Sequence, residues 1–451
     1  MSVITVQLGQ CGNQIGSSLF QCLAKEVDAC SGDAAAEARD AFFAERSPSQ
    51  GPGRAGSGRY KARAVLVDME PKVINAAMKA AQHNASWWSY DAAASFSQQS
   101  GSGNNWARGY NFYGPKFAET ACELVRRQVE AADHLGGFLL LQSMAGGTGA
   151  GLGTRIAEGL RDDFTSSFLL NHCIWPYESG EVIVQSYNTL LTLSHLTEVS
   201  DGVMLVENGA LNLACQRLLN IQRPSFTDMN AVAAQALAAA LLPARMRAAT
   251  PPAMGGGRGR RLGMLGDVVE HLCCHPGYRL LSLRAVPQMA AAAIDFTTFT
   301  WTAILRRLQQ MLITGSVTEE GMDWNVKISS PLERRARINK SLAALLTLRG
   351  QSAAEVDVAS FSNPAMYPSW AVQPLSVAYS PARFAKCEMS ASLLTNCQTC
   401  VGAVSRMQER AYKMLGAHAF LHQYAQFGLE AGHFEESFAR VEDVVQRYRS
   451  L

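Results

Sequence analysis

The sequence predicts an α/β protein built on a parallel β-sheet, and three junctions between strands and loops support this prediction. Apolar and polar residues alternate over Ser2–Leu8, and a helical pattern follows. Two further apolar runs, 62–67 and 137–142, also end abruptly, at Asp68 and Ser143. Strands that alternate with helices form parallel sheets, and such sheets bind ligands at the carboxyl ends of their strands. All three junctions are therefore expected at one edge of the sheet.

Length and charge narrow the classes of function. The chain has 451 residues, of which 48% are hydrophobic, and this is enough for the cores of two or three domains. Its 40 Lys and Arg residues nearly balance its 38 Asp and Glu residues, so no overall positive field favours nucleic acid. Apolar runs fall short of the roughly 20 residues that span a bilayer, and the amino terminus lacks a leader pattern. We expect a cytoplasmic protein with neither nucleic acid nor membrane as a partner.

The 11 cysteines are expected to be reduced thiols. An odd number of cysteines scattered over a long chain is typical of a cytosolic protein and not of a disulfide framework. Cys397 and Cys400 form one C-x-x-C motif, and Cys273, Cys274 and His275 are neighbours. A zinc site would need a second ligand pair at metal-binding spacing, which is not evident. Buried or inert thiols are therefore the expected interpretation.

The second half of the chain is predicted to begin with a helix. Two segments rich in residues that break helices and strands flank the predicted elements. Apolar residues recur every three or four positions between Asp228 and Met246, which predicts a long amphipathic helix connecting two domains. The segments 47–61 and 250–261 are rich in Gly, Pro and Arg and are expected on the surface. Their basic residues could contact an acidic partner or could be solvated insertions. Helices are predicted for the last part of the chain.

The segment Ala145–Gly151 is a Gly-rich turn between a strand and a helix. Glycine lets backbone N–H groups converge on an anion at the positive end of a helix, although it also serves close packing. Alone, this segment leaves both interpretations open. The chain has no G-x-x-x-x-G-K-[ST] motif, and the dinucleotide fingerprint fails after Gly9 because the pattern there is G-x-x-G.

Three other loops supply what a nucleoside triphosphate needs. Gln10 and Cys11 open the first helix and can offer N–H groups to phosphate. Asp68 and Glu70 provide the carboxylates that Mg²⁺ prefers, and Asn104 provides an amide on a tight turn. Each has a simpler interpretation as a loop residue, a helix cap or a turn former. A phosphate and metal site explains why they all follow strands of one sheet.

These loops together resemble the nucleotide loops of the tubulin superfamily. The resemblance rests on Gly9–Gly16, Val67–Pro71, Gly103–Ala107 and 145–151, and extends to Arg223–Pro224, Asn230 and Phe420–Tyr424. Within the superfamily the chain is most similar to delta-tubulins, over 143–153, 175–177 and 180–188. It implies a tubulin-like fold: a GTP-binding α/β domain with a parallel sheet over 1–209, a core helix and mixed α+β intermediate domain over 210–395, and carboxyl-terminal helices over 396–451.

The resemblance also implies a site for GTP or GDP with Mg²⁺. The phosphate contacts would be Gln10, Cys11, Asn104, Ser143, Gly146, Gly147, Thr148 and Gly149. Glu70 with Asp68 would hold the metal ion through water, and Glu181 stands where tubulins contact the ribose. Asn208 and Asn230 match the residues that read guanine, and Phe226 takes the place of a stacking aromatic residue.

Hydrolysis in tubulins depends on an acid from the next subunit, and the resemblance places Asp267 there, with Glu270 as an alternative. The two residues could equally cap a helix and lie on its solvated face. The chain is therefore expected to be at most a weak GTPase that a neighbouring subunit activates.

By resemblance, the expected function is cytoskeletal: assembly of centrioles or basal bodies and of their triplet microtubules. The expected partners are other tubulins, through longitudinal contacts and with lateral contacts left open, and centriolar or basal-body proteins. One alternative is an ordinary lattice-forming tubulin GTPase. Another is a nucleotide-using metabolic enzyme, for which no nucleophile or acid–base pair is evident.

Overall fold

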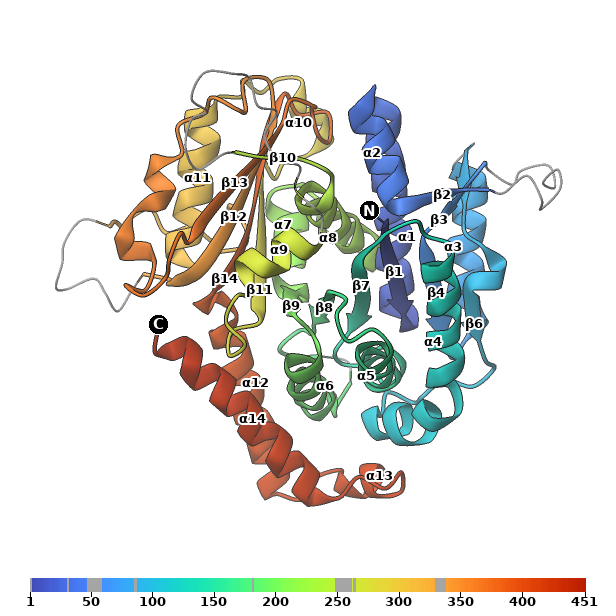
Figure 1. Cartoon of the computed structure of the whole chain (residues 1–451). Coiled ribbons are helices and arrows are strands. Elements are labelled where there is room, and N and C mark those ends of the chain that lie inside the picture. Colours follow the sequence, from blue (N-terminus) through green and yellow to red (C-terminus); the bar gives the residue numbers. More distant parts are fainter. Residues whose placement is uncertain are drawn as a thin grey trace.

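The computed structural model describes residues 2–30, 32–46, 59–84, 87–180, 182–247, 262, 265–328 and 338–451. Within these residues one sheet of eleven strands has the order β6, β4, β1, β7, β8, β9, β11, β14, β12, β13 and β10. Helices lie on both sides of the sheet, and the carboxyl-terminal helices run along one flank of the molecule (Figure 1).

The first six strands in this order are parallel to one another. They are β6 (Ser95–Ser97), β4 (Ala64–Asp68), β1 (Ser2–Leu8), β7 (Leu135–Ser143), β8 (Leu169–Trp175) and β9 (Gly202–Glu207). The strands predicted from the sequence at 2–8, 62–67 and 137–142 correspond to β1, β4 and β7. The predicted parallel α/β sheet is confirmed.

Helices bury both faces of this parallel part of the sheet. Every residue of β1 is buried, with Val3 in the core on one face and Ile4 and Val6 in the core on the other. This two-sided burial explains the apolar character of the parallel strands. The first core includes α1 (Gly9–Ala29), α3 (Pro71–Asn84), α7 (Asn208–Arg217) and α8 (Phe226–Leu241); the second includes α4 (Gly114–Glu130), α5 (Gly153–Asp163) and α6 (Gln185–Val199).

The sheet continues into the second half of the chain. Strand β9 pairs in parallel with β11 through Val203 with Leu280 and Met204 with Leu281. The remaining part of the sheet is mixed, because β14 is antiparallel to β11 and β12 while β13 is parallel to β12. Its elements are β10 (Arg245–Met246), α9 (Leu265–Leu272), β11 (Leu280–Val286), α11 (Trp301–Thr314), β12 (Ser341–Gly350), β13 (Leu375–Ser380) and β14 (Met389–Cys397). The limits of the domains stay predictions.

The core helix α8 is shorter than the apolar pattern predicted. It ends at Leu241, whereas the pattern continued to Met246. The prediction failed because Pro243 disfavours a helical conformation at the residue before it, and the chain becomes extended there. The buried Arg349 stabilises this end by donating to the carbonyl oxygens of Ala239, at 3.1 Å, and of Pro243, at 3.2 Å.

Three helices at the end of the chain pack on the second core. They are α12 (Val401–Gly416), α13 (Leu421–Ala425) and α14 (Ala431–Arg449), and they agree with the predicted carboxyl-terminal helices. The hydroxyl of the fully buried Tyr448 lies 2.8 Å from the Leu280 nitrogen and 2.6 Å from Asn396 Oδ1. The last helix is therefore bonded directly to the sheet.

A small second sheet lies beside the first helices (Figure 1). The remaining elements are α2 (Asp33–Phe42), β2 (Phe43–Glu45), β3 (Tyr60–Ala62), β5 (Trp88–Ser89) and α10 (Ala291–Ile294), with π-helical turns at Arg108–Tyr113 and Thr148–Leu152. Most of the two breaker-rich segments, 47–58 and 250–261, lies outside the described residues.

Three general properties concern the described residues. None of their helices is both long enough and apolar enough to cross a bilayer. All 11 cysteines are free thiols. No group of three or more His, Cys, Asp or Glu side chains in this part of the chain is arranged to hold a metal ion.

Candidate functional site

The loops after β1 and β7 meet backbone to backbone. Gly9 follows β1 with a φ of +69°, a conformation that glycine adopts without strain. A Cβ atom on Gly9 would lie 2.8 Å from the backbone nitrogen of Gly149, and a Cβ on Gly149 would lie 3.0 Å from the Leu8 carbonyl oxygen. Only glycines permit this approach. It places the start of α1 against the Gly-rich loop at one edge of the sheet.

The loop that carries Asn104 packs against one side of the Gly-rich loop. Ser102 Oγ lies 2.9 Å from Thr148 Oγ1, and a Cβ on Gly147 would lie 2.5 Å from Ser102 Oγ. Asn104 has a φ of 53°, and its Oδ1 lies 4.0 Å from where a Cβ on Gly146 would be. Asn104 is exposed, so its amide stands at the open side of the Gly-rich loop.

The other predicted phosphate contacts belong to the same two junctions. Gln10 is exposed and Cys11 is half-buried, and both lie in the first turn of α1. Burial raises the pKa of the Cys11 thiol to about 12, so it is neutral at pH 7 and does not repel an anion. Ser143 ends β7, and its Oγ accepts a hydrogen bond of 3.3 Å from the Ala145 nitrogen.

The two acidic residues after β4 differ in environment. Asp68 is buried and accepts a hydrogen bond of 2.7 Å from the Met69 nitrogen, whereas Glu70 is exposed. Burial raises the pKa of Asp68 to about 6, although bonds from the backbone of Met69 and Glu70 oppose the rise. Glu70 lies against the Asn104 loop, since a Cβ on Gly101 would be 2.5 Å from Glu70 Oε1. A metal cation bound here would supply the counter-charge that the buried Asp68 carboxylate lacks among the described residues.

Three residues of the predicted base contact lie on α7 and α8, which pack together. Asn208 begins α7 and is half-buried, Asn230 is buried in α8, and Phe226 begins α8 with 52% of its surface exposed. Ser225 and Asp228 fix the start of α8 through a capping box. Within the described chain neither Asn208 nor Asn230 makes a side-chain hydrogen bond, so both amides are available to a ligand.

Comparison with known proteins bears on this arrangement. Residues 2–216 match the GTPase domain of the Tubulin/FtsZ family. Over 471 aligned residues the chain is 41% identical to the tubulin delta chain of Mus musculus and to that of Macaca fascicularis, each alignment covering both chains completely. The tubulin delta chain of Homo sapiens is 41% identical over 473 residues, also with complete coverage. This chain belongs to the tubulin family.

Membership of the tubulin family narrows the functions that the sequence left open. The full-length similarity to delta chains identifies a delta-tubulin-like cytoskeletal protein and confirms the predicted resemblance. It also excludes the nucleotide-using metabolic enzyme. The match to a GTPase domain implies that this tubulin binds a guanine nucleotide.

Asn188 joins the nucleotide loops of this tubulin to its carboxyl-terminal helices. This fully buried side chain of α6 donates to the Asn104 carbonyl at 2.8 Å and to the Ala145 carbonyl at 2.7 Å. It accepts from the Trp106 nitrogen at 3.1 Å and from the Tyr424 hydroxyl at 2.6 Å. Both N–H groups and the oxygen of the Asn188 amide therefore have hydrogen-bond partners. Sequence reasoning gave Asn188 no role, although it ends the motif at 180–188.

Asn13 is a second buried amide that the sequence did not single out. Its Nδ2 lies 2.8 Å from the Gly9 carbonyl oxygen and 3.1 Å from the Val67 carbonyl oxygen. It therefore holds the end of β1 next to the end of β4, and thereby places Gln10 near Asp68. Its position in the motif Gly9–Gly16 was the available signal.

The two candidate catalytic acids lie away from this site. Asp267 is half-buried and Glu270 is exposed, both on α9. The first residue of α9, Leu265, contacts Gly137 near the start of β7, where a Cβ would be 3.2 Å from Leu265 Cδ1. The Gly-rich loop follows the other end of β7, roughly 20 Å along the strand. Within one chain these acids and the phosphate loops occupy opposite edges of the sheet.

The predicted ribose contact, Glu181, lies outside the described residues. Gln185, at the start of α6, donates from its Nε2 to the Tyr177 carbonyl at 2.8 Å. Tyr177 in turn contacts α8, because its hydroxyl lies 3.1 Å from Met229 Sδ, next to Asn230.

The raised pKa of Asp68 predicts a pH-dependent stability. The folded state retains a proton between the ordinary value of 3.8 and about 6, so the contribution of Asp68 to stability is full below 3.8 and is lost as the pH rises through 6. We expect Asp68→Asn to match the native protein below pH 4 and to exceed it by about 1–3 kcal/mol above pH 7, in magnesium-free buffer. Urea unfolding measured across this range checks the prediction.

Magnesium supplies the control for this measurement. A cation near Asp68 favours the ionised carboxylate, so added Mg²⁺ should narrow the difference between the two proteins above pH 7. A difference in unfolding free energy that stays constant from pH 4 to pH 8 would contradict the assignment of the proton to Asp68.

Proposed function

We propose that this chain holds a guanine nucleotide and Mg²⁺ at the edge of the sheet where β1, β4 and β7 end. The observation that carries the proposal is the contact of Gly9 with Gly149, which leaves the N–H groups of two helix starts close together. Gln10, Cys11, Asn104, Ser143 and the loop 146–149 would surround the phosphates.

The base would lie between α7 and α8. Asn208 and Asn230 can each accept from and donate to the purine edge, which neither a carboxylate nor an ammonium can do. Phe226 would stack on the base, and its exposed ring supports that role. Glu181 would contact the ribose.

The metal ion would sit beside the phosphates. Asp68 and Glu70 would hold Mg²⁺ through water, and the chemistry that the ion supplies is neutralisation of phosphate charge. The buried carboxylate of Asp68 supports this assignment, because a cation would stabilise its ionised form.

Nucleotide extraction tests the proposal. Gently purified native protein should release GTP or GDP, and Asn230→Ala should weaken guanine nucleotide binding by about 1–3 kcal/mol because a buried base edge loses its partner. Calorimetric titration of the stripped protein measures the difference. Gln235→Ala, an exposed amide on the same helix, is the matched control and should bind normally. Recovery of ATP, NAD or no nucleotide would count against the site.

We further propose that the chain acts in centriole or basal-body assembly, in triplet microtubules, with other tubulins and centriolar proteins as partners. The similarity to tubulin delta chains supports this proposal. Tagged protein should concentrate at centrioles, and its loss should disrupt triplets before cytoplasmic microtubules in electron micrographs. Uniform incorporation of the tagged protein along cytoplasmic microtubules would favour an ordinary lattice-forming tubulin.

Hydrolysis, in this proposal, needs a longitudinal neighbour that brings its Asp267 or Glu270 to the nucleotide of the next subunit. The separation of α9 from the phosphate loops supports a role in trans, since a catalytic acid must come within hydrogen-bond reach of the attacking water. Dilute protein should therefore hydrolyse GTP slowly or not at all.

Substitution of the two acids checks this mechanism. Asp267→Ala should change assembly turnover more than nucleotide affinity, because α9 lies away from the nucleotide loops of its own chain. Phosphate release and nucleotide binding, measured on the same preparations, separate the two effects. Rapid hydrolysis by dilute monomer that persists after both Asp267 and Glu270 are replaced by Ala would rule out catalysis in trans.

A further inference from the structure

Arg284 is a fully buried cation on β11, and its hydrogen-bond partners among the described residues are all neutral. Its Nε donates to the Ser316 carbonyl at 2.7 Å, Nη1 to Thr395 Oγ1 at 2.9 Å and Nη2 to Thr399 Oγ1 at 2.7 Å. No carboxylate within the described residues forms an ion pair with it. A buried guanidinium without a counter-charge is costly, so a negative group is expected beside it.

Cys397 lies between the two hydroxyls that Arg284 holds. Its Sγ is 3.3 Å from Thr395 Oγ1 and 3.2 Å from Thr399 Oγ1. Each threonine hydroxyl accepts from Arg284 and has one proton of its own, for which a second acceptor lies 3.3 Å away: the Ser282 carbonyl for Thr395 and Asn339 Oδ1 for Thr399. When Cys397 ionises, each hydroxyl can turn this proton from its long bond to the thiolate. Burial alone would raise the pKa of Cys397, but the charge of Arg284 and the threonine bonds bring it to about 7.

Cys400 provides a second thiol, and its pKa is shifted in the opposite direction to that of Cys397. Cys397 precedes a single 3₁₀ turn, Gln398–Cys400, which leads into α12. A tight turn of four residues brings its end Cα atoms within roughly 7 Å, the range that a disulfide requires. Burial, and then the charge of Cys397, raise the pKa of Cys400 to about 12, so it remains a protonated thiol.

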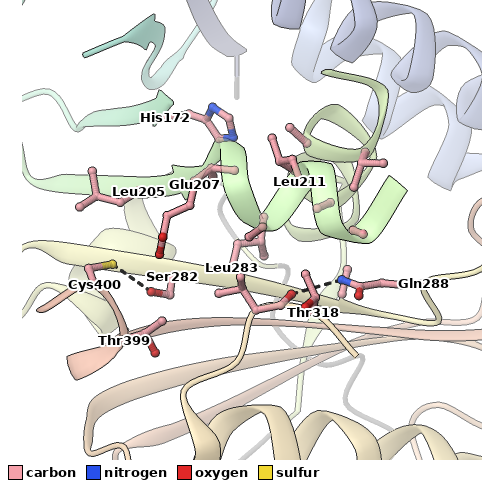
Figure 2. A pocket seen from close by; sticks show the side chains of 18 residues that line it. His172, Leu205, Glu207, Leu211, Ser282, Leu283, Gln288, Thr318, Thr399 and Cys400 are labelled. Carbon is pink, nitrogen blue, oxygen red and sulfur yellow. Dashed lines mark hydrogen bonds between the residues drawn. The ribbon is translucent and has the colours of Figure 1, made fainter. Parts of the chain in front are cut away.

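A cavity reaches Cys400 and Thr399, the two residues of this cluster that follow Cys397 in the chain. It has a volume of about 60 Å³ and is lined by Thr399, Cys400, Ser282 and Glu207 among others. Figure 2 shows Cys400 and Thr399 on its wall, with the bond of 3.2 Å between Cys400 Sγ and Ser282 Oγ. A molecule the size of water or peroxide needs only about 10–15 Å³. Other ionisable side chains around the pair include Glu207 and Tyr448.

We propose that Cys397 and Cys400 form a thiol modification site in which a Cys397 thiolate, held as the counter-ion of Arg284, reacts with peroxide and Cys400 resolves the product as a disulfide. This site is separate from the nucleotide loops. It replaces the expectation that both thiols of the C-x-x-C motif are inert.

The reaction balances with hydrogen peroxide as the oxidant. The Cys397 sulfur attacks one oxygen, an S–O bond forms, the O–O bond breaks, and the hydroxide that leaves takes up a proton to become water. The Cys400 sulfur then attacks the sulfenic acid. An S–S bond forms, the S–O bond breaks, and the departing hydroxide takes the Cys400 proton as a second water.

Peroxide titration of the full-length native protein tests the proposal. After a brief exposure to peroxide, the protein is denatured and its free thiols are blocked. It is then cleaved after Lys and Arg, and the mass of each peptide is measured. We expect the peptide between Lys386 and Arg406 to become lighter by two hydrogen atoms before other cysteine peptides react, with a rate half-maximal near pH 7. Because this peptide also contains Cys387, fragment ions must place the bond between Cys397 and Cys400.

Variants separate the thiolate mechanism from simple exposure. Arg284→Met should slow the reaction at pH 7 by about 10-fold or more, because the buried thiol would then stay protonated. Arg383→Met, at an exposed arginine, is the matched control and should react normally. Cys400→Ser should stop at a sulfenic acid that dimedone traps on Cys397, a result that does not depend on whether Arg284→Met folds.

Three results would overturn the site. The first is oxidation of Cys397 no faster than that of the buried Cys173, and the second is a rate that keeps rising beyond pH 9 as for an ordinary thiol. The third is peroxide reaction at Cys400 in a Cys397→Ser variant at the native rate, which would make Cys400 the attacking sulfur.

Discussion

The contact between the backbones of Gly9 and Gly149 is the constraint on which the nucleotide site depends. Two neighbouring parallel strands end at the same level, and the helices that follow them must start within van der Waals distance of each other. Side chains on these glycines would push the helix starts apart. The Asn104 loop, the acids after β4 and the amide of Asn13 are all arranged around this close approach.

The carboxyl-terminal helices contribute to the same site although they are far from it in sequence. Tyr424 bonds to Asn188, and the Asn105 side chain donates to the Gln423 carbonyl at 3.0 Å. The loops proposed to face the phosphates are thus held in part by the carboxyl-terminal helices. The bonds of Tyr424 and Gln423 link these helices directly to those loops.

The sequence predicted those features that have a local cause. The alternation of apolar and polar residues predicted β1. The Gly-rich loop and the carboxylates predicted the edge of the sheet at which a ligand would bind. It did not predict the role of Asn188, because four partners from distant segments define that role. The early end of α8 followed from Pro243, a signal that the apolar pattern obscured. The environment of Cys397 was not predicted because it depends on Arg284, which lies 113 positions earlier in the sequence. Arg284 bonds to Thr399, two residues after Cys397.

The seam between the two parts of the sheet is narrow. Strands β9 and β11 share two residue pairs, whereas β12 and β14 share nine. Fewer residue pairs therefore join the two parts of the sheet at this seam than join β12 to β14. The cavity of Figure 2 lies on the same seam, between Leu205 of β9 and Leu283 of β11. A group that filled this cavity would touch both parts of the sheet at once.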